Sequence, residues 1–535
     1  MGLPDCPIEG QPPVKHQRVI EILLVSGLLL AFALQCWFGM QLKTPSYDEK
    51  YHLAYGMNVL RGDPVRHNFR FDSKMPVSAL NALPLLVTGV HYEKDLPVVE
   101  KAAQRVTIVF GVLLGILIFV WSRGLYGPAG GLLSLSLFAF SPDFIAHSQL
   151  VTTDVYAALF MTAALWSFWH FLKSPDYSRA ALCGLLIGVA QIAKNNCVYL
   201  YPILILILFL KGLLWLIARP AGTRLRPGRS RLFRAAGMCA VFLLINLLLI
   251  NAGFLFHGFG SSLGTYHFKS EVFLQMQSRL HFMSSLPLPL PEPFLSGLDW
   301  VMFNERTGVS FKSSYLLGEL RQGAGFWNYY FVAFLYKVPL ATQALLLAAL
   351  IVHFLKRKQL DIASCDSILL LPAVFFFVYL SFFYRAQIGI RHLIIIFPLL
   401  YIFCGSLFSA GISGRWKLPA VCLLLVFQVW SVVSYYPHYL SYFNELLPDK
   451  SRAFEILADS NLDWHQNRRF LKAFLRHNPD VIVSPEGPVA SRVIVPVNEL
   501  VGLFGPERYR WLRENFRPVG HVAYSYILFD CRGGG

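Results

Sequence analysis

Charged side chains are scarce in this sequence: only 15% of its 535 residues are Asp, Glu, Lys or Arg, whereas 55% are hydrophobic. Soluble domains typically carry about 25% charged residues. The mean hydropathy of +0.50 reflects the same imbalance. The composition therefore excludes an ordinary soluble protein and predicts an integral membrane protein.

Two kinds of short motif are also missing. No Cys-x-x-Cys occurs, and the nine cysteines are scattered or lie inside apolar runs, where a thiol behaves as a small hydrophobe. Neither a disulfide framework nor a zinc site is indicated. The sequence also lacks any Asn-x-Ser/Thr acceptor site, which weakly favours a bacterial source over a secretory-pathway source.

The formal net charge of +16 comes without a nucleic-acid-binding pattern. Lys and Arg gather in short segments between apolar runs, and no basic stripe with interleaved aromatic residues is present. The clearest such segment, residues 218–234, holds six arginines and no acidic residue. Basic segments of this kind stay on the cytoplasmic side of a membrane, so we expect membrane lipids rather than nucleic acid as partners.

Apolar runs of about the length of a membrane span recur along the chain. They begin near residues 19, 104, 128, 153, 178, 198, 234, 327, 366, 391 and 417. With the amino terminus and the basic segments inside, these eleven spans place the chain from about residue 435 outside. We therefore expect an all-α polytopic membrane protein whose transmembrane module covers residues 1–434.

Three outer regions are longer than simple connections, which typically have about four to six residues. They are residues 41–103, 253–325 and 435–535. In the first region, residues 58–65 and 78–88 are predicted to form short helices. In the second, the proline-rich residues 286–294 are predicted to be extended.

The third outer region is predicted to be a small α/β domain outside the membrane, covering residues 435–535. Residues 481–484, 493–496 and 521–529 have the composition of strands. They surround a predicted helix that contains Arg508, Arg510 and Arg513.

The most informative polar stretch, residues 44–52, directly follows the first apolar run and contains two adjacent acids, Asp48 and Glu49. A charge at the edge of a membrane is costly unless it has a function or a partner. In a helix, Asp48 and His52 would share one face and Glu49 would point elsewhere, so one acid is enough to serve a reaction centre. The alternative is a pair of solvated loop acids.

Other polar residues extend this candidate site. Tyr51 follows the acidic pair, and Lys74, later in the same loop, suits an anionic lipid phosphate because it is a mobile point charge. Asp143, His147 and Asp154 lie at helical spacing in a second outer stretch. A divalent metal at His147 and Asp154 stays open, and so does a helix cap with its partners, for which Asp143 is the better candidate.

Cations inside apolar runs also need an explanation. Lys194 follows the run 180–193, Arg391 and His392 open the run 393–408, and Lys337 lies about ten residues into the run that starts at residue 326. A buried Lys must pair with an acid, a carbonyl or a ligand, whereas Lys194 and Arg391 can also snorkel to the interface. Together, the acids and cations indicate a negatively charged lipid-linked donor and a hydroxyl acceptor.

Several motifs resemble those of the protein O-mannosyltransferase and lipid A aminoarabinose transferase group. They are Tyr47-Asp48-Glu49, Lys74-Met75-Pro76, Val151-Thr152-Thr153-Asp154 and Gln191-Ile192-Ala193-Lys194. Four later stretches, residues 326–340, 388–392, 442–445 and 459–464, resemble a bacterial, family 39-like branch of that group. The sequence departs from the group at Met75, where aminoarabinose transferases have Pro, and at His465, where Gly is expected.

The resemblance implies a GT-C fold and the use of a polyprenyl-phosphate sugar as donor. It implies that one acid of the pair Asp48 and Glu49, by position Asp48, is the general base for an inverting transfer. It also implies that Lys74 and Arg391, together with Lys194, bind the departing phosphate.

We therefore expect a membrane glycosyltransferase that acts on a hydroxyl of a protein, lipid or glycan. Its expected location is the bacterial inner membrane, with a cytoplasmic amino terminus and an extracytoplasmic active site. One alternative is a transporter or flippase of lipid-linked sugars, which predicts paired repeats and broken helices; the sequence indicates neither. Another is an assembly platform that binds partners through its tail.

Overall fold

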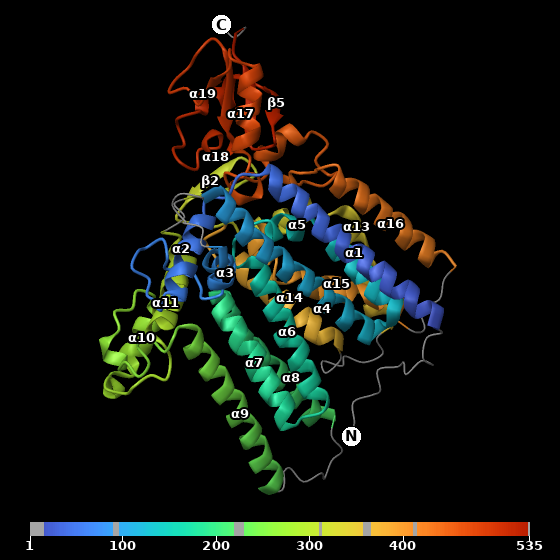
Figure 1. Cartoon of the computed structure of the whole chain (residues 1–535), viewed down its shortest axis with the longest axis vertical. Coiled ribbons are helices and arrows are strands. Elements are labelled where there is room, and N and C mark those ends of the chain that lie inside the picture. The colour runs from blue at the N-terminus through green and yellow to red at the C-terminus, as the bar shows by residue number, and fades with distance from the viewer. Residues whose placement is uncertain are drawn as a thin grey trace.

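The computed structural model describes residues 15–88, 96–218, 229–309, 313–356, 365–409 and 415–532. Part of the arginine-rich segment, residues 219–228, lies outside the described residues. The described chain forms a helical bundle with a small sheet domain at one end (Figure 1).

Each of the eleven predicted apolar runs contains helix, which confirms the mostly α-helical fold. The bundle helices are α1 (Lys15–Leu42), α4 (Leu96–Ala139), α6 (Asp154–Lys173), α7 (Tyr177–Ala193), α8 (Leu200–Ala218), α9 (Arg229–Gly253), α12 (Tyr329–Lys337), α13 (Leu340–Lys356), α14 (Cys365–Phe382), α15 (Phe397–Cys404) and α16 (Lys417–Val433). Two predicted runs share α4, which breaks at Gly127, where φ is 79°. Five described helical segments are long and apolar enough to cross a membrane, or six if α12 and α13 form one span, so the count of eleven spans stays a prediction.

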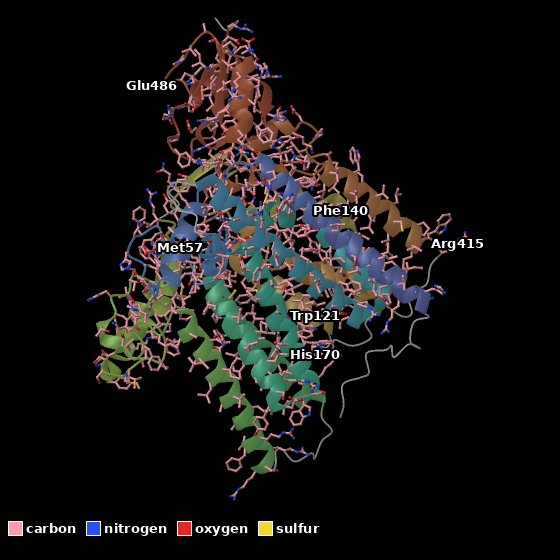
Figure 2. The ribbon with its side chains drawn as sticks, in the orientation of Figure 1. Met57, Trp121, Phe140, His170, Arg415 and Glu486 are labelled. Atoms are coloured by element: carbon pink, nitrogen blue, oxygen red, sulfur yellow. The ribbon has the colours of Figure 1, made fainter. Side chains whose placement is uncertain are left out.

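The bundle has two distinct ends. In Figure 2, His170 and Arg415 lie toward the end of the bundle that is remote from the sheet domain, whereas Glu486 lies at the tip of that domain. His170 is in the last turn of α6, and Arg415 lies just before α16. The two expected cytoplasmic turns that follow α6 and precede α16 therefore lie away from the C-terminal domain.

A break between α12 and α13 was not expected from the sequence. The two helices meet at 112°, because Val338 is extended and Pro339 cannot donate a backbone hydrogen bond or permit a helical residue before it. Lys337 therefore lies at the end of α12, not in the middle of a continuous span. Its ammonium donates to the backbone oxygens of Leu440 at 2.8 Å and Asn461 at 2.6 Å.

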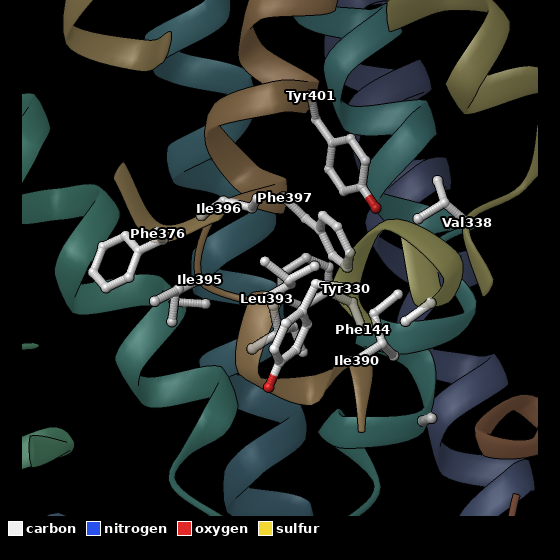
Figure 3. Packing of buried hydrophobic residues seen from close by; sticks show 14 of the residues in the cluster. Phe144, Tyr330, Val338, Phe376, Ile390, Leu393, Ile395, Ile396, Phe397 and Tyr401 are labelled. Carbon is white, nitrogen blue, oxygen red and sulfur yellow. The ribbon is translucent and has the colours of Figure 1, made fainter. Parts of the chain in front are cut away.

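An apolar core holds the short 3-10 turn η4 (Ile390–Leu393) between α12, α14, α15 and α5 (Pro142–Ser148). Figure 3 shows Ile390 and Leu393 of this turn packed among Phe144, Tyr330 and Phe397. Burying each such side chain contributes about 1.5–3 kcal/mol. This packing fixes the backbone on both sides of Arg391.

The first outer region contains α2 (Glu49–Leu60) and α3 (Ser78–Thr88). Helix α3 has the predicted bounds, but the helix predicted at 58–65 is wrong. The observed helix starts earlier and stops near Gly62, where φ is 91°. Pro64 follows and cannot continue a helix.

The second outer region contains α10 (Glu271–Arg279), α11 (Glu292–Thr307) and a hairpin of β1 (Ser313–Leu316) and β2 (Glu319–Gln322). The predicted extended segment 286–294 ends at Pro291, because α11 begins at Glu292. Proline is well tolerated in the first turn of a helix, so Pro293 does not prevent the start.

The C-terminal domain is α/β, as predicted, with the strand order β3-β4-β6-β5. Its elements are α17 (Arg468–His477), β3 (Ile482–Val483), β4 (Arg492–Pro496), α18 (Val497–Leu500), α19 (Arg510–Asn515), β5 (Pro518–Val522) and β6 (Tyr526–Asp530). The single strand predicted at 521–529 is instead an antiparallel hairpin. Ala523 and Tyr524 have φ of 54° and 60°, as a tight hairpin turn requires.

The close packing of α2 on α3 gives a test of the fold. A Cβ on Gly56 would lie 2.7 Å from the carbonyl carbon of Ser78, whereas a Cβ on Gly27 in α1 would meet nothing within 4 Å. We expect Gly56→Ala to cost about 1–3 kcal/mol by overpacking and to lower the melting temperature in detergent. The control Gly27→Ala should not lower it, and equal behaviour of the two variants would contradict the packing.

Candidate functional site

A cavity of about 570 Å³ lies where the outer loops meet the bundle. Its wall brings together segments that are far apart in the sequence: the start of α2, the loop before α3, the turn before α6, the turn after α7, helix α11 and the stretch 384–392. The predicted site residues on this wall are Asp48, Tyr51, His52, Lys74, Asp154, Lys194, Arg391 and His392. Glu49, His147 and Lys337 do not line it.

Asp48 is the acid that faces the cavity. It lies just before α2, its side chain is 25% exposed, and the nearest cationic atom is Nη1 of Arg391 at 4.0 Å from Oδ2. Within the described residues, no hydrogen bond occupies its carboxylate. A free carboxylate in a cavity is able to accept a proton from a bound hydroxyl.

Glu49 points away from the cavity, as expected from helical geometry. Its Oε1 accepts from the Ser46 N–H at 2.6 Å, and its Oε2 accepts from Gln104 Nε2 at 2.8 Å and the Val151 N–H at 3.0 Å. Burial raises the pKa of Glu49, although these hydrogen bonds oppose the rise. Glu49 therefore ties the first outer loop to α4 and to the turn before α6.

Tyr51 and His52 follow on α2 and complete this side of the cavity. The Tyr51 hydroxyl is buried and finds no partner within the described residues, whereas Nδ1 of His52 lies 3.1 Å from Ser78 Oγ. Burial and the nearby charge of Lys74 lower the pKa of His52 well below its usual value. His52 is therefore a neutral group at pH 7.

Lys74 and Arg391 bring poorly compensated positive charge to the cavity. Lys74 is 6% exposed, and its ammonium has no hydrogen bond or ion pair within the described part of the chain. Burial lowers its pKa, and the charge of Asp48 opposes that effect. Arg391 stacks its guanidinium 4.1 Å from the centre of the Trp464 ring, and its buried Nε has no partner among the described residues.

Lys194 differs because it has an acidic partner at hydrogen-bond distance. Its ammonium donates to Asp154 Oδ1 at 2.5 Å, and His147 Nδ1 lies 3.5 Å from the other carboxylate oxygen of Asp154. These three groups form a buried set at the start of α6. Lys194 thus has less charge available for a ligand than Lys74 or Arg391.

His147 and Asp154 do not lie on one continuous helix, as their spacing suggested. Helix α5 ends at Ser148 and α6 starts at Asp154, and the intervening turn brings the two side chains together. The predicted cap at Asp143 is also wrong, because Ser141 Oγ accepts the N–H of Phe144. No group of three His, Cys, Asp or Glu side chains that could hold a metal occurs in the described ranges.

Two further predicted residues have different surroundings. His392 lines the cavity, and both of its ring nitrogens lie 3.4 Å from the Tyr384 hydroxyl. Lys337 is buried elsewhere, between two backbone carbonyls and the ring of Phe443 at 4.8 Å. Lys337 therefore joins parts of the fold and does not face the cavity.

Glu305 is a cavity residue that the sequence did not reveal. It lies on α11, is 3% exposed, and its Oε2 accepts from the hydroxyls of Tyr199 at 2.8 Å and Tyr379 at 2.7 Å. Burial raises its pKa to about 7. In the sequence it looks like an ordinary loop acid, because both tyrosines are distant along the chain.

Unsatisfied polar atoms gather on the cavity wall. Buried side-chain atoms without a hydrogen-bond partner in the described structure include Tyr51 Oη, Thr152 Oγ1, Asn195 Oδ1, Glu305 Oε1 and Arg391 Nε, all from residues that line the cavity. Such atoms are costly when they stay unpaired. The cavity therefore fits a ligand that has several hydrogen-bonding groups and a negative charge.

Part of the chain matches a known family. Residues 97–223 match the family model described as dolichyl-phosphate-mannose-protein mannosyltransferase. Over this region the chain is similar to those mannosyltransferases. The matched region is about a quarter of the sequence and includes Asp154 and Lys194 of the cavity, and it confirms the resemblance seen in the sequence motifs.

The solved structures that match this chain include two proteins, both with TM-scores below 0.5. One is ArnT from Cupriavidus metallidurans bound to undecaprenyl phosphate, with 11% identity and a TM-score of 0.48, covering 96% of this chain and 98% of that chain. The other is the archaeal oligosaccharyltransferase AglB from Archaeoglobus fulgidus in complex with an inhibitory peptide and a dolichol-phosphate, with 12% identity and a TM-score of 0.47, covering 86% and 60%. No curated protein sequence matches significantly.

The contrast between Asp48 and Glu49 gives a test of the site. We expect Glu49→Gln to lower the melting temperature, because the new amide places a donor against a backbone or side-chain N–H at a cost of about 1–3 kcal/mol. Asp48→Asn should lower the melting temperature less, since it removes no hydrogen bond. Thermal unfolding of the two purified variants in detergent measures the difference, and an equal loss in both would contradict the assigned environments.

Proposed function

We propose that this glycosyltransferase transfers a sugar from a polyprenyl-phosphate donor to an acceptor hydroxyl, with Asp48 as general base. The observation that carries the proposal is the cavity itself, in which the free carboxylate of Asp48 lies beside Lys74 and Arg391. The family match over residues 97–223 supports a lipid-linked sugar as donor.

The donor phosphate would bind between Lys74 and Arg391. Within the described residues, Asp48 is the one nearby acid for both cations and forms a hydrogen bond with neither, so a phosphate would lower the free-energy cost of burying their charges. Lys194 would act at longer range, because Asp154 holds its ammonium. As the bond between the sugar and phosphate breaks, negative charge grows on the phosphate, and these cations stabilise it most in the transition state.

Asp48 would remove the proton of the acceptor hydroxyl. The acceptor oxygen then forms a bond with the anomeric carbon while the bond from that carbon to the phosphate oxygen breaks, and polyprenyl phosphate leaves with the electron pair. Attack from the face opposite the phosphate inverts the anomeric configuration. In this scheme the unpaired polar atoms of Asn195 and Glu305 are available for sugar hydroxyls.

The cavity would open on the extracytoplasmic side of a bacterial inner membrane. It lies next to the segment that leads into the sheet domain, since Arg391 stacks on Trp464. The turns next to His170 and Arg415 lie away from the sheet domain, and basic turns of this kind stay cytoplasmic. With this polarity, the C-terminal domain would lie outside.

A transporter of lipid-linked sugars is the second candidate, and the broken pair α12 and α13 favours it. Broken helices line the binding sites of many transporters. The break here, however, presents Lys337 to backbone carbonyls of the tail and not to the cavity. Product formation by purified protein in detergent, where no membrane separates two compartments, distinguishes transfer from transport.

Loss of the base should abolish transfer without loss of donor binding. We expect Asp48→Asn to lower transfer from radiolabelled polyprenyl-phosphate sugars to background in membranes with matched expression, because an amide cannot take the proton. The control Asp63→Asn changes an exposed acid of the same loop, which pairs with His67, and should keep wild-type turnover. Full activity in Asp48→Asn would remove Asp48 from the mechanism.

Loss of either phosphate cation should weaken lipid binding. We expect Lys74→Ala and Arg391→Ala each to weaken binding of undecaprenyl phosphate by about tenfold to a hundredfold, the value of a hydrogen bond to a charged group. Native mass spectrometry of the purified protein measures this affinity. Arg61→Ala removes an exposed cation at the end of α2 and should have no effect; an equal loss in this variant would indicate only general charge attraction.

A further inference from the structure

A nine-residue stretch of the tail contacts both sides of the proposed reaction centre. This segment, residues 459–467, precedes α17 and includes the 3-10 turn η8 (Asp459–Asn461). Most of its side chains are buried. It passes between the loop that carries Asp48 and the turn that carries Arg391.

On the Asp48 side, the contacts are made with the backbone. The Tyr47 N–H donates to the Trp464 carbonyl at 3.1 Å, and the Thr44 N–H donates to the Gln466 carbonyl at 3.0 Å. The Thr44 hydroxyl donates to the His465 carbonyl at 2.8 Å. These bonds hold the residues directly before Asp48, whose own carboxylate has no hydrogen bond within the described residues.

On the Arg391 side, the same segment holds the turn η4. Asn461 Oδ1 accepts from the Ile390 N–H at 3.0 Å, and Ser460 Oγ donates to the Ile388 carbonyl. The Trp464 ring lies under the Arg391 guanidinium. Asn461 is itself fixed, because its Nδ2 donates to the Tyr329 hydroxyl at 3.0 Å and to the Ala458 carbonyl at 2.9 Å.

No hydrogen bond joins Asp48 directly to Arg391. Their nearest atoms are 4.0 Å apart, a contact that leaves both side chains free to reorient. The segment 459–467 is hydrogen-bonded both to residues 44–47 and to residues 388–390. The conformation of this segment therefore sets the distance between the Asp48 carboxylate and the Arg391 guanidinium. The sheet domain supports the segment, since Asn498 accepts from the Asp459 N–H and donates to the Asp463 carbonyl.

We infer that segment 459–467 is a positioning element, in which Trp464 orients Arg391 for the donor phosphate and the Trp464 to Gln466 backbone orients Asp48 for the acceptor. This inference rests on the proposed transferase function. Residues 459–464, one of the stretches singled out in the sequence, thereby gain a role. They set the distance between the proposed base, Asp48, and the proposed phosphate site at Arg391.

The two sides of the segment predict different kinetic effects. Trp464→Leu removes the stacking partner of Arg391. It should raise the donor KM about tenfold and weaken binding of undecaprenyl phosphate by the same factor, while kcat changes little. Thr44→Val keeps the backbone bonds but removes the hydroxyl bond to His465, so it should lower kcat about fivefold through a misplaced base with the donor KM unchanged. A purely structural role of the segment would move both parameters together in both variants.

A double-variant cycle tests whether Trp464 acts through Arg391. In an Arg391→Ala background, Trp464→Leu should cause no further loss of undecaprenyl phosphate binding, because the partner of the ring is already absent. Trp464→Phe keeps an aromatic face and should retain near-wild-type binding, which also covers the case in which Trp464→Leu fails to fold. Trp416→Leu, which changes an exposed Trp next to α16, is the matched control and should behave as wild type.

The outcomes separate this inference from the proposed function. Independent, additive losses from Trp464→Leu and Arg391→Ala would overturn the positioning role, and so would wild-type KM and kcat in Trp464→Leu and Thr44→Val. A wild-type protein that binds undecaprenyl phosphate but transfers no sugar would overturn the proposed transferase. In that case the binding cycle alone still decides whether Trp464 positions Arg391.

Discussion

The structure depends on positive charge that is buried without enough negative charge to balance it. Lys74 and Arg391 share one nearby acid, Asp48, at a distance that leaves all three without a hydrogen bond to one another. Asp154 contributes only at longer range, because it forms its hydrogen-bonded ion pair with Lys194. Burying an ion costs several kcal/mol even after the protein relaxes. A bound anion would reduce this cost, which is the electrostatic argument for the proposed phosphate ligand.

Asp48 and Glu49 are adjacent in the sequence but have different surroundings, because their side chains point in different directions from α2. Successive residues of a helix point about 100° apart, so Asp48 faces the cavity while Glu49 faces the bundle. Glu49 accepts three hydrogen bonds, two of them from residues more than fifty positions away along the chain. These three buried hydrogen bonds fix the position of the first residue of α2. The fixed start of the helix in turn directs the Asp48 side chain into the cavity.

Much of this site could be predicted from the sequence because charges stand out in an apolar chain. Lys74, Lys194 and Arg391 were identified in that way, and all three line the cavity. Residues whose roles depend on distant partners were harder to identify. The surroundings of Glu305 come from Tyr199 and Tyr379, and no local pattern indicates that these three meet.

The positions of the helices could also be predicted from the sequence, whereas the breaks and turns between them could not. Hydrophobic runs located the helices, since burial in a membrane demands apolar length. The bend between α12 and α13 and the hairpin of β5 and β6 depend on single backbone positions, Pro339 in one case and Ala523 with Tyr524 in the other. A hydropathy pattern does not register such positions, although a proline inside an apolar run is a local signal for a break.

The bend at α12 also explains why a buried lysine is kept at its end. Lys337 donates to the carbonyl of Asn461, and the amide of the same Asn461 accepts the Ile390 N–H beside Arg391. A leucine at this position would leave the carbonyls of Leu440 and Asn461 without their buried donor, at a cost of about 1–3 kcal/mol for each group. The lysine thus links the bundle to the tail through Asn461, and Asn461 also holds the turn that carries Arg391. The break after Lys337, the two hydrogen bonds of its ammonium and the position of the turn around Arg391 are therefore connected through Asn461.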